Sequence, residues 1–142
     1  MSFHPLLPAV LVVDDQLTVR RLSYRMLSEA GFRVYEASGA AEALSVLEET
    51  GGRIRLTIID VVMPDIDGIE LSQMILDRWP NQLILFMSAH PAEIMVRHGL
   101  ENPLVHFLAK PFTAEQLVAK VSEAIDRRLM PRPRGPARPP RD

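Results

Sequence analysis

The segment LVVDD, residues 11–15, places two neighbouring carboxylates directly after three apolar residues. Adjacent carboxylates repel each other and are costly to remove from water, and the first basic residue after them is Arg20. A bound cation would compensate this charge, and oxygen donors of this kind are the ligands that Mg²⁺ prefers. The chain has no cysteine, and nothing in it suggests the thiolate or histidine ligands of zinc.

Short apolar runs alternate along the chain with stretches in which apolar residues recur at spacings of three and four. The first pattern indicates buried strands and the second indicates helices. Such alternation predicts a doubly wound α/β fold, in which five helices cover both faces of a five-stranded parallel sheet. The predicted strands are 9–13, 32–37, 56–59, 83–87 and 105–109.

Start and stop signals bound the predicted helices. The first helix presents Val19, Leu22, Met26, Leu27 and Ala30 inward and stops at Gly31. The signals for the other four are Ser38 with Gly51 and Gly52, Asp67 and Glu70 with Trp79 and Pro80, Pro91 with Gly99 and 102–103, and Thr113 with Gln116.

In open α/β sheets, ligands bind beyond the carboxyl ends of the strands. The fold therefore predicts one edge that gathers three carboxylates, one hydroxyl and one ammonium group. Such an edge could bind Mg²⁺, and one carboxylate could act as a nucleophile towards a phosphoryl group. Without Mg²⁺, we expect at least one carboxyl pKa to be raised by its neighbours. The residues are Asp14, Asp15, Asp60, Ser88 and Lys110.

Length, charge and composition limit the number of domains and the kinds of partner that the chain can have. The 142 residues predict one domain, over 1–130, followed by a disordered tail rich in Pro and Arg at 131–142. The net charge is −2 and the tail holds four Arg and one Asp, so the domain itself is acidic, which argues against nucleic acid as its partner. We expect no signal peptide, and the sequence holds no run of about 20 apolar residues that would predict a membrane span. We expect a cytoplasmic protein with no membrane partner.

Four motifs occur in an order that resembles the receiver domain of two-component response regulators: LVVDD, IIDVVMPDIDG, MSAH and FLAKPF. The resemblance covers about residues 8–128 and implies a flavodoxin-like sheet with strand order 2-1-3-4-5. It implies that Asp60 accepts the phosphoryl group. It also implies that Mg²⁺ is bound by Asp14, Asp15, Asp60 and the backbone carbonyl of Val62.

The other matched positions receive roles from the same resemblance. Ser88 matches the switch hydroxyl, Phe107 the switch aromatic residue that turns inward with it, and Lys110 the lysine that pairs with a phosphoryl oxygen. Pro111 matches a proline that usually follows a cis peptide bond, and Pro64 and Gly68 match the loop after the phosphoacceptor.

Two positions differ from the common pattern. Residue 62 is Val, where many members of the family carry a polar residue, and residue 90 is His. In the family these side chains flank the phosphoryl group and tune its hydrolysis. Val62 offers no hydrogen bond to an attacking water, so we expect an intermediate or long phosphoryl lifetime.

Segment 97–106 resembles the same segment in receivers at the C-terminal end of hybrid sensor kinases. Met1, in contrast, favours a single-domain regulator, and both alternatives stay open.

The resemblance implies a phosphoacceptor switch in a phosphorelay. The phosphoryl donor would be a sensor histidine kinase or histidine phosphotransfer protein, and the output would be altered contacts with an unknown downstream protein. No DNA-binding domain is expected to follow, and we expect a monomer or weak dimer. The domain would catalyse only its own phosphorylation and dephosphorylation.

Three other functions are disfavoured by the sequence. A phosphatase would need a proton-exchanging residue where Val62 stands, and a flavin or nucleotide binder would not place the acids of DDQLTVR where a phosphate binds. An inactive scaffold would not need the complete set of Asp60, Ser88 and Lys110.

Overall fold

The computed structural model describes residues 8–90, 92–94 and 105–129. Five parallel strands form one sheet in the order β2-β1-β3-β4-β5, which confirms the predicted sheet and strand order. The largest difference from prediction is in β3, which is extended at both ends. The strands are β1 (Ala9–Val13), β2 (Arg33–Ala37), β3 (Ile54–Asp60), β4 (Leu83–Ser88) and β5 (Val105–Ala109).

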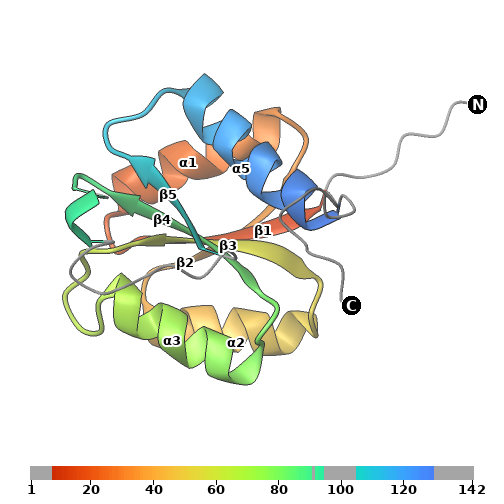
Figure 1. The fold of residues 1–142 in the computed structure, drawn as a ribbon, viewed down its shortest axis with the longest axis vertical. Helices are drawn as coiled ribbons and strands as arrows, with labels where there is room; N and C mark the ends of the chain where they lie inside the picture. Colours follow the sequence, from red (N-terminus) through yellow and green to blue (C-terminus); the bar gives the residue numbers. More distant parts are fainter. Residues whose placement is uncertain (1–7, 91, 95–104, 130–142) are drawn as a thin grey trace, which may run out of the picture.

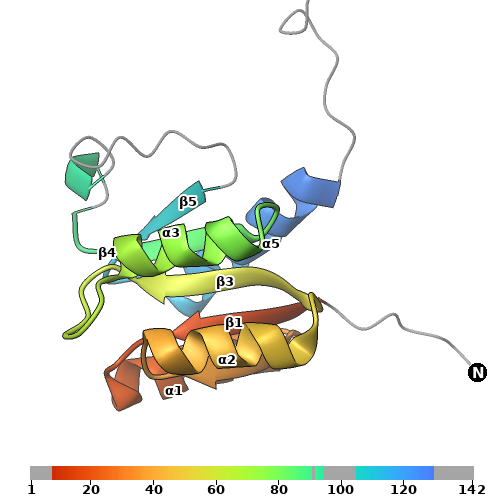
Figure 2. The ribbon, with the colours of Figure 1, turned by 90° about the horizontal axis from the view of Figure 1, so that it is seen from below.

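Helices cover both faces of this sheet (Figure 1). α1 (Leu17–Glu29) and α5 (Ala114–Leu129) lie on one face, and α2 (Ala40–Thr50) and α3 (Gly68–Arg78) lie on the other, as Figure 2 shows from a second direction. Residues 92–94 are also helical. The signals predicted for the rest of the fourth helix (Pro91, Gly99 and 102–103) and the tail at 131–142 lie outside the described residues.

Alternating side chains of the strands build a separate core on each face. Leu11 and Val13 of β1 pack with α2 and α3, whereas Val10 and Val12 pack with α1 and α5. All five residues of β1 are buried. A strand buried on both faces reads as a continuous apolar run, so the carboxylates that follow β1 begin where the core ends.

Helix boundaries follow the sequence signals with one difference. The Asp67 carboxylate accepts a hydrogen bond from the Glu70 N–H at 2.8 Å, and Gly51 ends α2 in the left-handed conformation with φ 57°. Thr113 and Gln116 form the reciprocal capping box that the sequence predicts, with hydrogen bonds of 2.8 and 3.1 Å. Ser38, however, precedes the N-cap Gly39, and its N–H and hydroxyl both donate to the Glu42 carboxylate.

The inward face predicted for α1 is partly wrong. Leu22 is 49% exposed and Ala30 is an exposed C-cap residue, whereas Ser23 is buried beside Leu27. The spacing alone does not decide between residues 22 and 23. Residue 22 lies four positions before 26, and residue 23 lies three before 26 and four before 27, so either could share their face of the helix. In the structure, α1 is oriented so that Ser23 and Leu27 are its buried residues.

Candidate acidic site at the carboxyl edge of the sheet

The register of the sheet brings the predicted site residues to one edge. Val13 lies opposite Ile59, so Asp14 and Asp60 leave their strands side by side. Ser88 ends β4 opposite Ala109, and the next residue, Lys110, donates its backbone N–H to the Ser88 carbonyl at 2.9 Å. Residues from four strand ends therefore meet at one edge, as the rule for parallel sheets predicts.

Three carboxylates lie together at this edge. Asp14, Asp15 and Asp60 each offer an oxygen, and these atoms lie within 4.8 Å of one another. Asp14 and Asp60 are buried, whereas Asp15 is exposed. The cluster is therefore partly removed from water but open on one side.

The bonding of Asp14 leaves one oxygen without a partner. Its Oδ1 accepts the Gln16 N–H at 2.9 Å, whereas its Oδ2 is buried and makes no hydrogen bond to any of the described residues. An unsatisfied buried oxygen is costly, and in a native structure it marks the place of a ligand or a strained group. One oxygen from each of the three carboxylates, all within 4.8 Å of one another, fits Mg²⁺, which binds oxygen donors and keeps several of its waters. The residues present therefore fit the predicted metal.

Burial is the largest cause of the shifted acidity in this cluster. Burial raises the pKa of Asp14, and the charges of Asp60 and Asp15 raise it further, while the Gln16 N–H and the charge of Lys110 oppose the shift. Burial also raises the pKa of Asp60, against the charge and hydrogen bond of Lys110 and the Val62 N–H. The predicted direction is confirmed, but neighbouring charges are a smaller cause than desolvation.

Lys110 forms an ion pair with Asp60. Its Nζ lies 3.2 Å from Asp60 Oδ1, and the two side chains are 26% and 8% exposed. The Lys110–Pro111 peptide bond is cis, as the resemblance implies. The ammonium group therefore pairs with one of the three carboxylates of the acidic cluster.

The model of the response regulator receiver domain family matches residues 10–122. The chain belongs to this family. Among known proteins, a sensor kinase named CckA from Brucella abortus is 34% identical over 118 residues, which are 83% of this chain and 12% of that protein.

Solved receiver structures share the fold. The receiver domain of the hybrid histidine kinase CckA is 33% identical with a TM-score of 0.69, and the match covers 82% of this chain and 98% of that domain. A response regulator receiver domain protein from Clostridium thermocellum is 27% identical with a TM-score of 0.77, covering 87% and 100% of the two chains. The chain spans 12% to 52% of the length of three of the curated relatives that it matches. None of the helices in the described ranges has the length and apolar character of a membrane span.

The remaining predicted residues of the receiver site differ in burial and in the contacts that they make. The buried Ser88 hydroxyl accepts the His90 N–H at 2.9 Å, while His90 itself is exposed. Val62 is 77% exposed, so its side chain points into solvent beside the cluster. Phe107 is half-buried and packs against Phe86, with 5.3 Å between ring centroids.

Gly68 is required for a reason that the sequence pattern does not reveal. It starts α3 and donates its N–H to the Val61 carbonyl at 2.8 Å. A Cβ atom at this position would lie 2.4 Å from the carbonyl oxygen of Asp60. The glycine therefore allows α3 to approach the backbone of Asp60, whereas the resemblance implied only a position in the loop after the phosphoacceptor.

Two contacts to Asp14 were missed by sequence reasoning. Gln16 contributes only its backbone, and any residue other than proline could do the same. Arg20 donates from its guanidinium to the Asp14 carbonyl at 2.9 Å. The only signal for Arg20 in the sequence is that it is the first basic residue after the acidic pair.

Proposed function

We propose that Asp60 accepts a phosphoryl group in a Mg²⁺-dependent reaction and that the chain acts as a phosphorylation switch in a phosphorelay. The observation that carries this proposal is the unpartnered Asp14 Oδ2 in a cluster of three carboxylates, one of which pairs with Lys110. The donor set suits a hard cation, and the neighbouring carboxylate suits a nucleophile.

The proposed reaction is transfer from a phosphohistidine to Asp60. A carboxylate oxygen of Asp60 forms a bond to phosphorus, the N–P bond of the phosphohistidine breaks, and the released imidazole nitrogen takes up a proton. Mg²⁺ bound by the acidic cluster would neutralise negative charge on the carboxylates and phosphoryl oxygens. Lys110, already 3.2 Å from Asp60, would then pair with a phosphoryl oxygen.

We propose a sensor histidine kinase or a histidine phosphotransfer protein as the donor. The similarity to a sensor kinase and to response regulators supports this class of partner. The exposure of Asp15 and Val62 around the cluster also supports it, because an open edge suits a phosphoryl group presented on another protein better than an enclosed small substrate.

The proposed output is a change in contacts with a downstream protein. Ser88 would reorient to bind the phosphoryl group, and Phe107 would shift with it across Phe86. Whether the chain works alone or as part of a longer kinase stays open. A beryllofluoride complex, which mimics the phosphoryl group, tests the switch: amide resonances of Ser88 and Phe107 should shift, whereas resonances that do not move would contradict it.

We propose that the chain catalyses only its own phosphorylation and dephosphorylation and acts on no metabolic substrate. The experiment that tests the acceptor is incubation with Mg²⁺ and acetyl phosphate, followed by peptide mapping of the modified residue. Modification at Asp60 supports the proposal, and modification elsewhere contradicts it. Rapid hydrolysis of a generic phosphomonoester would instead favour a phosphatase, for which Val62 supplies no acid or base.

A further inference from the structure

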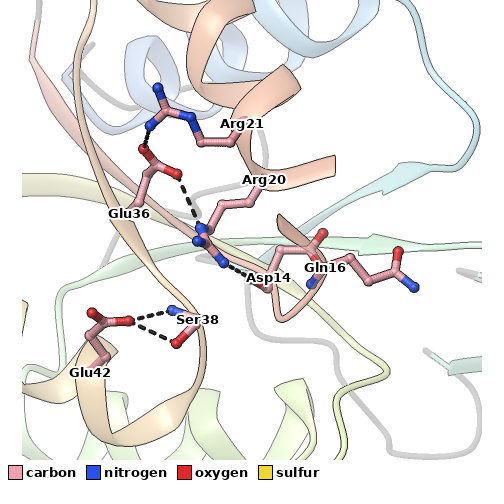
Figure 3. A network of polar contacts seen from close by, with 7 residues as sticks. All are labelled: Asp14, Gln16, Arg20, Arg21, Glu36, Ser38 and Glu42. Atoms are coloured by element: carbon pink, nitrogen blue, oxygen red, sulfur yellow. Dashed lines mark hydrogen bonds and ion pairs between the residues drawn. The ribbon is translucent and has the colours of Figure 1, made fainter. Parts of the chain in front are cut away.

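Arg20 joins three elements beside the acidic cluster (Figure 3). From α1, its Nη1 donates to the Asp14 carbonyl at the end of β1 at 2.9 Å. Its Nε donates to Glu36 Oε1 of β2 at 3.0 Å. One planar guanidinium thus connects a residue of the candidate metal site to the edge strand of the sheet.

The Arg20–Glu36 pair is well shielded from water. The two side chains are 15% and 18% exposed, whereas Arg21, which binds the other oxygen of Glu36, is 57% exposed. A shielded ion pair holds its geometry better than an exposed one, and the fixed fork of a guanidinium directs its donors. The pair is therefore suited to fixing the position of whatever Arg20 binds.

Asp14 is held at every polar atom except one. Its N–H donates to the Ala37 carbonyl at 3.1 Å, its carbonyl accepts from Arg20, and its Oδ1 accepts from the Gln16 N–H. Only Oδ2 has no partner. The bonds orient the residue so that its free oxygen remains at the cluster.

We propose that Arg20 is a positioning residue for the cation site, that Glu36 holds Arg20 in place, and that the pair tunes the affinity for Mg²⁺ through the orientation of Asp14. This inference rests on the proposed function, because it concerns the same cation site. Partners that orient metal ligands typically change metal affinity by about 10–100-fold when they are removed.

A role through charge alone predicts the opposite result. Arg20 carries a positive charge near the cluster, so its removal would lessen repulsion and tighten Mg²⁺ binding. Removal of a positioning residue weakens binding despite this gain. The direction of the change in Kd therefore separates the two roles.

The chain offers a matched control in Arg21. Arg20→Met and Arg21→Met each remove one positive charge and one partner of Glu36, but only Arg20 contacts Asp14. Mg²⁺ affinity is measured on the full chain by NMR titration of the backbone amides of residues 14, 15 and 60. We expect a Kd about tenfold weaker in Arg20→Met and close to the parent value in Arg21→Met.

Three outcomes would overturn the inference. The first is an Arg20→Met protein that binds Mg²⁺ as tightly as the parent or more tightly, and the second is equal weakening in both variants. Where Arg20→Met does not fold, Arg20→Lys keeps the charge but cannot reproduce the guanidinium fork, and a parent-like Kd in that variant is the third. A parent chain that binds no Mg²⁺ would instead overturn the proposed function, and the inference with it.

Discussion

Lys110 Nζ lies 3.2 Å from Asp60 Oδ1, although 50 residues separate the two along the chain. The contact forms because β3 and β5 both end at the same edge of the sheet, on either side of β4. The ion pair is partly shielded and offsets part of the cost of burying the Asp60 carboxylate. The contribution of this ion pair to the stability of the fold and its effect on the pKa of Asp60 can both be measured.

Lys110→Met should destabilise the metal-free protein at neutral pH by about 1–2 kcal/mol, because it leaves the buried Asp60 charge without its partner. It should also raise the pKa of Asp60, since Lys110 lowers it in the parent chain. The loss should therefore shrink as the pH falls and Asp60 becomes protonated. Urea denaturation at several pH values measures this, and a loss of equal size at every pH would contradict the ion pair as its cause.

Asp14→Asn should raise the stability of the metal-free protein and remove the stabilisation by Mg²⁺. Asparagine keeps the oxygen that accepts from Gln16 but removes the buried charge. The melting temperature without Mg²⁺ should rise by a few degrees, given that about 1 kcal/mol corresponds to roughly 2–8 °C for domains of this size. Asp15→Asn is the control, and its gain should be smaller because Asp15 is exposed. A less stable Asp14→Asn protein would count against the account.

The pH dependence of that gain follows from the raised pKa of Asp14. The folded protein binds the proton more tightly than the unfolded chain, so ionisation costs stability as the pH rises from the ordinary pKa of 3.8 through the raised value. The advantage of Asp14→Asn should be full above the raised pKa of Asp14 and should vanish as the pH falls towards 3.8. The difference in unfolding free energy between the variant and the parent measures this, and an advantage that grows at acid pH would contradict it.

Thr57→Val should stabilise the protein by about 0.5–1 kcal/mol. Thr57 lies fully buried within β3, and its hydroxyl has no hydrogen-bond partner in the part of the chain that the structure describes. Thr50→Val is the matched control, because the buried Thr50 hydroxyl donates to the Val46 carbonyl at 2.8 Å. We expect that variant to lose about 0.5–1.5 kcal/mol. Equal changes in the two urea midpoints would show that the hydroxyl bonding is not the cause.

Val62 should give the phosphorylated state an intermediate or long life. Its exposed side chain stands beside the cluster and cannot orient a water for attack. Val62→Asn adds a hydrogen-bonding group and should shorten the lifetime several-fold, as followed by loss of the phosphorylated mass over time. A half-life of a few seconds in the parent protein would contradict the prediction.

The positions of Asp14, Asp60, Ser88 and Lys110 could be predicted because each follows an apolar run, and parallel strands end at one edge. The capping box of Thr113 and Gln116 was predictable for a different reason, because both partners lie within one helical turn. In each case the contact is fixed by local pattern or by sheet topology.

Other features depend on tertiary packing and could not be read from the pattern. The rotation of α1 decides that Ser23 is buried and Leu22 exposed. That orientation also brings Arg20 to Glu36, 16 residues away on another element. The predominance of burial over neighbouring charge at Asp14 likewise depends on how completely the surrounding helices and strands exclude water.

Phosphorylation of Asp60 at a Mg²⁺-dependent site can be followed by intact-mass measurement after incubation with acetyl phosphate. Three samples are compared: the parent in Mg²⁺, the parent in EDTA, and Asp60→Asn in Mg²⁺. We expect one added phosphoryl group in the first sample and none in the other two. This prediction would be contradicted by an unmodified parent whose Mg²⁺ binding is confirmed by titration, or by equal modification of Asp60→Asn.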